Sequence, residues 1–118
     1  MIILSKLVQM AQGNKVTALS GKTASYTTIP QKANNHNAIR LYFQITAGSG
    51  TWTIKLQGQS NSGTWVDCYD NNGNQMHISG ATSNISQSFV TLPEKFRIVA
   101  TEDSDGATVT VDYELFSV

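Results

Sequence analysis

The fold is decided by the stretch Ile39-Arg-Leu-Tyr-Phe-Gln-Ile-Thr46, which a Gly48-Ser-Gly50 turn joins to Thr51-Trp-Thr-Ile-Lys-Leu-Gln57. Apolar and polar residues alternate in both runs, so residues 39, 41, 43 and 45 share one face and residues 52, 54 and 56 share another. Such alternation between Gly- and Ser-rich turns is typical of antiparallel strands, because successive side chains point to opposite faces of a sheet. One face of each strand is predicted to meet a core, and the other to meet water or a partner.

The same alternation recurs along the chain. Asn71-Asn-Gly-Asn74 predicts a tight hairpin turn, because Asn and Gly tolerate the positive φ angles of such turns. The segment 79–84 is expected to be a loop, and in the last run residues 109, 111, 113 and 115 are expected to point inward. We predict a single all-β domain over residues 1–118, a two-sheet antiparallel β-sandwich of jelly-roll or immunoglobulin-like type with about eight strands. Besides the first two runs, strands are predicted over residues 15–20, 64–70, 75–78, 85–92, 94–101 and 107–118.

The charge balance indicates which partners to expect. The chain carries 8 Lys and Arg residues against 8 Asp and Glu residues, so its formal net charge is zero, and no run of basic residues occurs. Binding to nucleic acid or to an anionic membrane surface normally requires a basic patch, so neither partner is expected. A net charge near zero favours association over repulsion between copies, which indicates a chain that belongs to an assembly.

The residues that usually carry chemistry are sparse. Cys68 is the single cysteine, which excludes an internal disulfide and a Cys-based zinc site, and it is expected to be a small buried apolar residue. His36 and His77 lack a second histidine at metal-ligand spacing, and Asp103-Ser-Asp-Gly106 lacks the distal Glu of a calcium loop. We therefore predict no catalytic residues, no metal site and no cofactor, and we expect that the chain is not an enzyme.

The beginning of the chain is apolar. Met1-Ile-Ile-Leu-Ser-Lys-Leu-Val-Gln-Met10 is interrupted by Lys6, and its apolar runs are shorter than those of a signal peptide or a membrane span. We predict that residues 1–12 form an assembly arm in which Ile2, Ile3, Leu4 and Leu7 bind a neighbouring subunit. The alternative is that the same residues form an edge strand of their own domain.

A second candidate site lies in the run 64–70. Trp65, Asp67 and Tyr69 share one face by their parity, opposite Val66 and Cys68. If that face is exposed, the two aromatic rings could stack on a sugar while Asp67 binds its hydroxyl groups. The alternative is that Trp65 and Tyr69 point into the core and Asp67 lies at the margin of the sheet.

Part of the sequence resembles a known class of proteins. Gly50-Thr-Trp-Thr-Ile-Lys-Leu-Gln-Gly-Gln-Ser-Asn-Ser-Gly-Thr-Trp-Val-Asp67 is similar to a strand, Gly turn and Thr-Trp-Val-Asp pattern of small virion proteins of tailed bacteriophages. Pro93-Glu-Lys-Phe-Arg-Ile-Val-Ala100 and Val109-Thr-Val-Asp-Tyr-Glu-Leu115 resemble the last strands of such domains, so the likeness spans residues 39–115.

This resemblance implies a structural role in the virion. The expected protein is a capsid decoration, head-fibre or tail-associated β-sandwich that assembles symmetrically, as a homo-oligomer or with other capsid or tail subunits. Discoidin-like and other carbohydrate-binding sandwiches share the Gly-turn-Trp feature. A carbohydrate-binding module or receptor-binding domain that uses the aromatic face therefore stays as the alternative.

Overall fold

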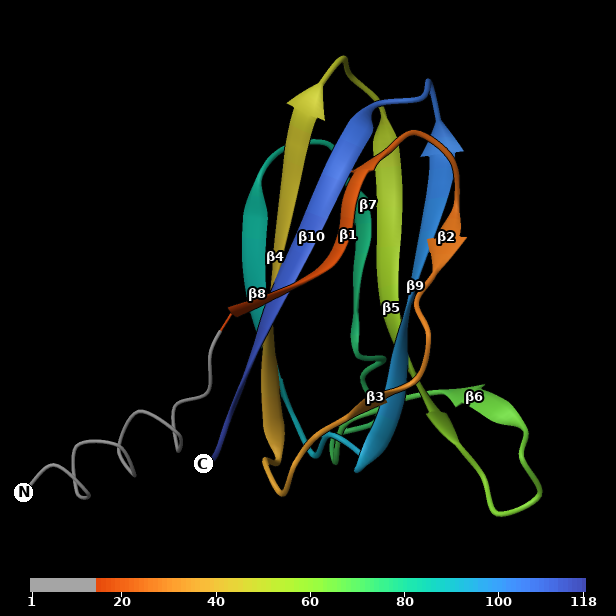
Figure 1. Ribbon diagram of the computed structural model, residues 1–118, viewed down its shortest axis with the longest axis vertical. Coiled ribbons are helices and arrows are strands. Elements are labelled where there is room, and N and C mark those ends of the chain that lie inside the picture. Colours follow the sequence, from red (N-terminus) through yellow and green to blue (C-terminus); the bar gives the residue numbers. More distant parts are fainter. Residues whose placement is uncertain (1–14) are drawn as a thin grey trace, which may run out of the picture.

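Ten β-strands make up residues 15–118, the part of the chain that the computed structural model describes (Figure 1). These residues contain no helix, so none that is long and apolar enough to cross a membrane. The prediction of an all-β chain is confirmed, with two strands more than expected. The strands are β1 (Lys15–Lys22), β2 (Tyr26–Thr27), β3 (Gln31–Lys32), β4 (Ala38–Ala47), β5 (Thr51–Gln59), β6 (Trp65–Asp67), β7 (His77–Ala81), β8 (Ile85–Val90), β9 (Lys95–Ser104) and β10 (Thr108–Phe116).

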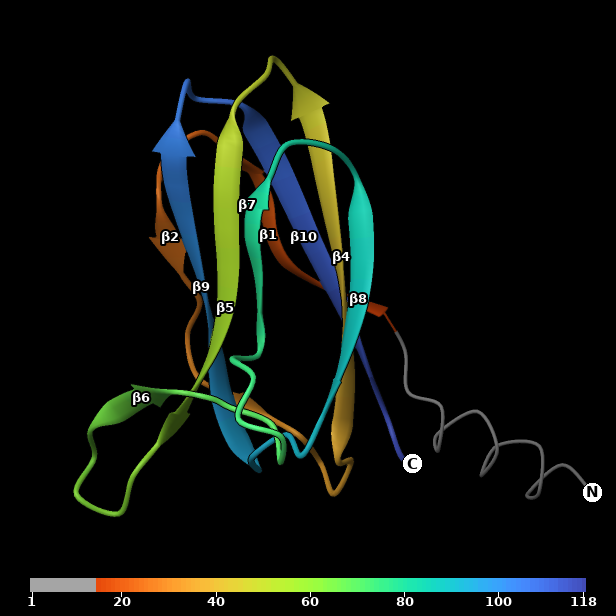
Figure 2. The ribbon, with the colours of Figure 1, turned by 180° about the vertical axis from the view of Figure 1, so that it is seen from behind.

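The strands form two antiparallel sheets that face each other (Figures 1 and 2). A four-stranded sheet has the order β1-β10-β4-β8, and a six-stranded sheet has the order β2-β9-β5-β6, with β3 also paired to β9 and β7 to β5. β2 and β3 both pair with β9 and can be counted as one interrupted strand, and β6 and β7 both pair with β5 and can be counted as another. With this count, every connection crosses from one sheet to the other, except the connection from β5 to β6. Immunoglobulin domains keep several successive strands in one sheet, so this strand order is that of a jelly roll.

The core lies between the two sheets and is built from the alternating residues of the long strands. The inward positions of β4 and β5 predicted from sequence are almost all buried, as are Val109, Val111, Tyr113 and Leu115 of β10. Trp52 has no exposed surface, and its indole Nε1 donates a hydrogen bond to the carbonyl oxygen of Ala107, 3.1 Å away. The alternation predicted from sequence is therefore confirmed where it places the core.

The segment between β5 and β8 differs from the predicted strands. The run expected over residues 64–70 forms a strand only at β6, and β7 extends into the segment that was expected to be a loop. β5 changes its partner here, since Gln57 lies opposite Asp67 of β6 whereas Lys55 lies opposite His77 of β7. The pairing of β7 with β5 shifts register between Ile78, which lies opposite Ile54, and Ala81, which lies opposite Trp52. Gly80 lies within this shift and has a φ of 61°, which is typical of a β-bulge.

The predicted hairpin turn at residues 71–74 is present. Tyr69 and Gln75 form an isolated antiparallel bridge, and the backbone N–H of Asp70 donates to the carbonyl oxygen of Asn74 at 2.8 Å. Gly73 takes a φ of 82°, as the Asn-Gly pattern predicted. The predicted arm over residues 1–12, with Ile2, Ile3, Leu4 and Leu7, lies outside the described residues.

Candidate binding surfaces

Trp65 and Asp67 lie on the outer face of the six-stranded sheet. β6 pairs with the end of β5, where Gln59 lies opposite Trp65 and Gln57 lies opposite Asp67. Residues that lie opposite each other in an antiparallel pair share a face, and this face is the outer one because Leu56 and Gly58 are buried. Trp65 therefore does not point into the core.

The side chains around Trp65 form a connected polar network, which we call the Trp65 cluster and which consists of Trp65, Asp67, Gln57, Lys55 and Arg97. The guanidinium carbon of Arg97 lies 4.6 Å from the centroid of the Trp65 ring, in a cation–π contact. Arg97 Nε also donates to Gln57 Oε1 at 2.8 Å, and Gln57 Nε2 donates to Asp67 Oδ1 at 2.9 Å. Lys55 Nζ lies 3.0 Å from the same carboxylate oxygen. Sequence reasoning missed Arg97, because β9 reaches this place only through its pairing with β5.

The network lowers the pKa of Asp67. The hydrogen bond from Gln57, and after it the Lys55 ammonium, hold the pKa of the Asp67 carboxyl below its ordinary value. The Asp67 side chain is still 34% exposed, so its carboxylate can reach a ligand in solution. The cluster thus presents an aromatic ring beside fixed donors and acceptors, although Arg97 already lies over one face of the ring.

Tyr69 takes no part in the described contacts of the Trp65 cluster. It lies beyond the end of β6, its backbone bridges to Gln75, and its side chain is 57% exposed. Of the three predicted sugar-binding residues, the structure therefore joins Trp65 and Asp67 in the Trp65 cluster, while Tyr69 lies between β6 and the turn at residues 71–74.

Cys68 points toward the core and not toward the surface of the cluster. It is partly buried against the core, and burial raises the pKa of its thiol, with a further contribution from the charge of Asp67. A thiol with a raised pKa is a poor nucleophile at neutral pH. Within residues 15–118, no three His, Cys, Asp or Glu side chains are grouped so that they could hold a metal ion.

A second polar surface lies on the outer face of the four-stranded sheet. The Tyr42 hydroxyl of β4 donates to Glu114 of β10, and this hydrogen bond raises the pKa of Tyr42 above its ordinary value. Lys15 Nζ lies 4.5 Å from the centroid of the Tyr42 ring, and Gln44 Nε2 donates to Asp112 Oδ2 at 3.3 Å. These contacts tie together β1, β4 and β10, the three strands that carry the outer face beside β8.

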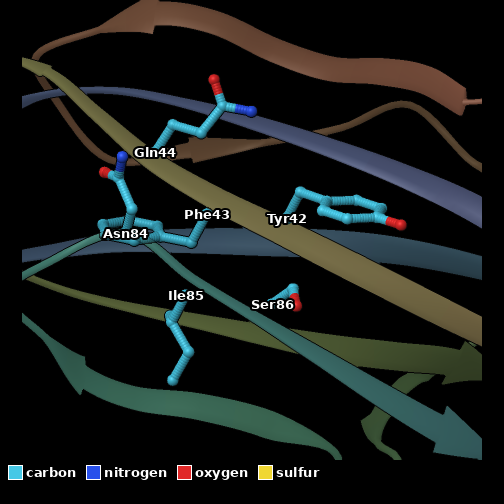
Figure 3. Close-up of a pocket in the computed structure, with 6 residues that line it drawn as sticks. All are labelled: Tyr42, Phe43, Gln44, Asn84, Ile85 and Ser86. Atoms are coloured by element: carbon cyan, nitrogen blue, oxygen red, sulfur yellow. The ribbon is translucent and has the colours of Figure 1, made fainter.

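A shallow groove of about 270 Å³ lies where β4 meets β8 (Figure 3). The backbone N–H of Ile45 donates to Asn84 Oδ1 at 2.9 Å, which fixes the loop that enters β8. Sequence analysis did not identify this groove, because it depends on the pairing of two strands about forty residues apart. It is lined by Tyr42, Phe43, Gln44, Asn84, Ile85 and Ser86.

Comparison with known proteins gives similarity at the level of structure. No family model matches the chain, and no curated protein sequence matches it. The crystal structure of the SPBc2 prophage-derived protein YomS is similar, with 13% sequence identity and a TM-score of 0.62 over 86% of this chain and 90% of that chain. What the two share is the fold. Subunits of Bacillus endospore appendages, described as a family of disulfide-linked pili, have 15% identity and a TM-score of 0.48 over 88% of this chain and 87% of theirs.

Proposed function

We propose that this chain is a structural, non-enzymatic protein of a tailed-bacteriophage virion, a capsid decoration protein or a head-tail fibre-associated protein that binds neighbouring virion subunits. The observation that carries the proposal is the similarity to a prophage-derived protein, which spans 86% of this chain and 90% of that one and so covers most of both. Jelly rolls are also common among viral capsid proteins, although a fold by itself does not determine a function.

The described surfaces support a role in assembly. The net charge is zero, Lys55 and Asp67 of the Trp65 cluster form an ion pair, and Arg97 is held by Gln57 and by the Trp65 ring. A subunit of this kind can pack against neighbours without long-range repulsion. In the proposed mechanism, four apolar residues bury their side chains against a neighbouring subunit: Ile2, Ile3, Leu4 and Leu7. Each Å² of apolar surface removed from water contributes about 25 cal/mol to the free energy of binding. Such a contact becomes strong when symmetry repeats it around a particle.

The first test is sedimentation of native source material through a density gradient, with this chain followed by mass spectrometry. We expect the chain to migrate with large particles and to stay with them in moderate salt, because apolar contacts are not screened. Recovery only as a small soluble species would contradict the proposal.

A second test is deletion of residues 1–10. We expect the shortened chain to lose its attachment to particles and to keep the melting temperature of the full chain, because the proposed arm contributes to binding and not to the core. The matched control is Ile29→Ser, which removes an apolar side chain that is 74% exposed and should leave attachment unchanged. Loss of folding in the deletion variant would show instead that these residues belong to the core.

Carbohydrate binding is a second candidate function, which the Trp65 cluster favours because an aromatic ring lies beside a partly exposed, ionised Asp67. For this function we expect Trp65→Ala to abolish binding on an array of oligosaccharides while the domain stays folded. Tyr26→Ala is the matched control, since Tyr26 lies on β2 and contacts Lys22, away from the cluster, so its loss should leave binding intact. A wild-type chain that binds no sugar on the array would exclude this candidate.

A further inference from the structure

The free edges of the two sheets differ in how well they are protected against pairing with another strand. β1 pairs with β10 through two register shifts, and it carries Lys15 and Lys22. β2 and β3 are two residues long each, and Pro30 separates them. β6 has three residues, and β7 has an irregular register with Gly80 at a φ of 61°. Bulges, lysines, prolines and short strands are the usual devices by which proteins prevent edge-to-edge association.

β8 has none of these devices. Its sequence, Ile85-Ser-Gln-Ser-Phe-Val90, contains no charged residue, no proline and no glycine. It pairs with β4 in an unbroken register from Ala38 opposite Val90 to Phe43 opposite Ile85. The strand lies at the margin of the four-stranded sheet, with β4 on one side (Figure 2). A regular, uncharged edge strand of this kind is a template for an added strand.

The inner face of β8 is also left open. Ile85 and Gln87 lie opposite Phe43 and Leu41, which are buried in the core, so their side chains belong to the inner face of the sheet. Even so, Ile85 is 45% exposed and Gln87 is exposed, whereas Phe89 of the same face is buried. The apolar side chain of Ile85 therefore lies on the core side of the four-stranded sheet but remains in contact with water at the edge formed by β8.

We propose that a second copy of this chain adds to the edge of β8, with the two β8 strands antiparallel across a two-fold axis at Gln87. Residues that lie opposite each other in an antiparallel pair share a face, so the inner-face residues 85, 87 and 89 of one copy must lie opposite inner-face residues of the other. This condition is met only when the two-fold axis passes through a residue and not between two residues. A centre at Gln87 and a centre at Ser88 each pair five residues of the six-residue strand, and of these two only the Gln87 centre pairs apolar residues with each other. It places Ile85 opposite Phe89 of the partner subunit, which covers the exposed apolar surface, and Ser86 opposite Ser88 of the partner subunit.

The second copy is the occupant that the chemistry of the edge favours. β8 carries no charge, so two copies bring no like charges together, and the Gln87-centred register pairs apolar with apolar and hydroxyl with hydroxyl. Stable interfaces bury about 800 Å² on each partner, which is more than six edge residues provide. We therefore expect a weak, concentration-dependent dimer that becomes strong only where other contacts hold the copies together. This inference rests on the edge geometry and is independent of the proposed virion role.

Disulfide trapping tests the register directly. Residues that face each other across antiparallel strands have Cα atoms about 4.5–5.5 Å apart, within the range that a disulfide bridges. In a Cys68→Ala background, Gln87→Cys should therefore form a covalent dimer under mild oxidation of concentrated full-length protein. Val90→Cys is the matched control, because the two copies of residue 90 would lie about 20 Å apart in this register at a rise of roughly 3.3 Å per residue. We expect at least about tenfold more covalent dimer from Gln87→Cys than from Val90→Cys, since only the first pair meets the geometric limits of a disulfide.

A second measurement does not depend on new cysteines. Ser86→Lys places a charge on the edge and should abolish the concentration-dependent dimer in sedimentation equilibrium, with an unchanged melting temperature as the check on folding. Equal cross-linking of the two cysteine variants, or none in either, would overturn the proposal. The proposal would also be overturned if deletion of residues 1–10 abolished the dimer. In that case residues 1–10 would occupy the edge of β8, in place of β8 from a second copy.

Discussion

Trp52→Ala is expected to lower the free energy of unfolding by about 3–5 kcal/mol, which is the usual cost of removing a fully buried Trp. The side chain has no exposed surface, so the substitution leaves a large cavity between the sheets. It also removes the indole N–H that donates to the carbonyl oxygen of Ala107, in the connection between β9 and β10. That acceptor is buried, so its lost partner adds to the cost.

The matched control for this prediction is the other tryptophan of the chain. Trp65→Ala removes a ring from the outer face of the six-stranded sheet, where its described contact is with the guanidinium group of Arg97. An exposed cation–π contact contributes about 0.5–1 kcal/mol, so we expect a loss of about 1 kcal/mol. Urea denaturation of both variants, followed by circular dichroism, makes the comparison. Equal losses would show that Trp65 is part of the core and that its assignment to the outer face is wrong.

The sequence predicted the core well because the core depends on a local signal. Alternation of apolar and polar residues determines which face of a strand points inward, and this can be read within one strand. Residues 52, 54 and 56 of β5 and residues 109 and 111 of β10 are accordingly buried, as the pattern predicted. The choice between jelly-roll and immunoglobulin-like strand order depends on which strands pair across the chain, and the pattern left that choice open.

The candidate surfaces were harder to predict because each depends on pairing between distant segments. Arg97 reaches Trp65 only because β9 pairs with β5 in the register that sets Arg97 opposite Gln57. Tyr69 shares its parity with Trp65, but β6 ends at Asp67 and Tyr69 bridges to Gln75, so parity alone did not show which of the three residues would join Arg97 and Gln57. The open edge at β8 likewise became visible only when its register with β4 was known.

Gly50→Ala is expected to lower the free energy of unfolding by about 1–3 kcal/mol, the usual cost of forcing extra volume into a packed site. A Cβ atom at this position would lie 2.5 Å from the carbonyl oxygen of Ser104 and 2.9 Å from the backbone nitrogen of Ala107. Both neighbours are backbone atoms, so neither can move aside as a flexible side chain would. Glycine is therefore required here by the close approach between two connections, the one that follows β4 and the one that follows β9.

Ser49→Ala is the matched control for Gly50→Ala, because Ser49 is the exposed neighbour in the same turn and its loss should change the free energy by less than about 0.5 kcal/mol. The same connection after β9 provides the acceptor for Trp52, so displacement of Ala107 in Gly50→Ala should also weaken that hydrogen bond. The double variant Gly50→Ala/Trp52→Ala should then lose less stability than the sum of the two single variants, because both act on one contact. Strict additivity in urea denaturation would show that the two sites are independent, and a Gly50→Ala variant as stable as Ser49→Ala would show that the turn has room for a side chain.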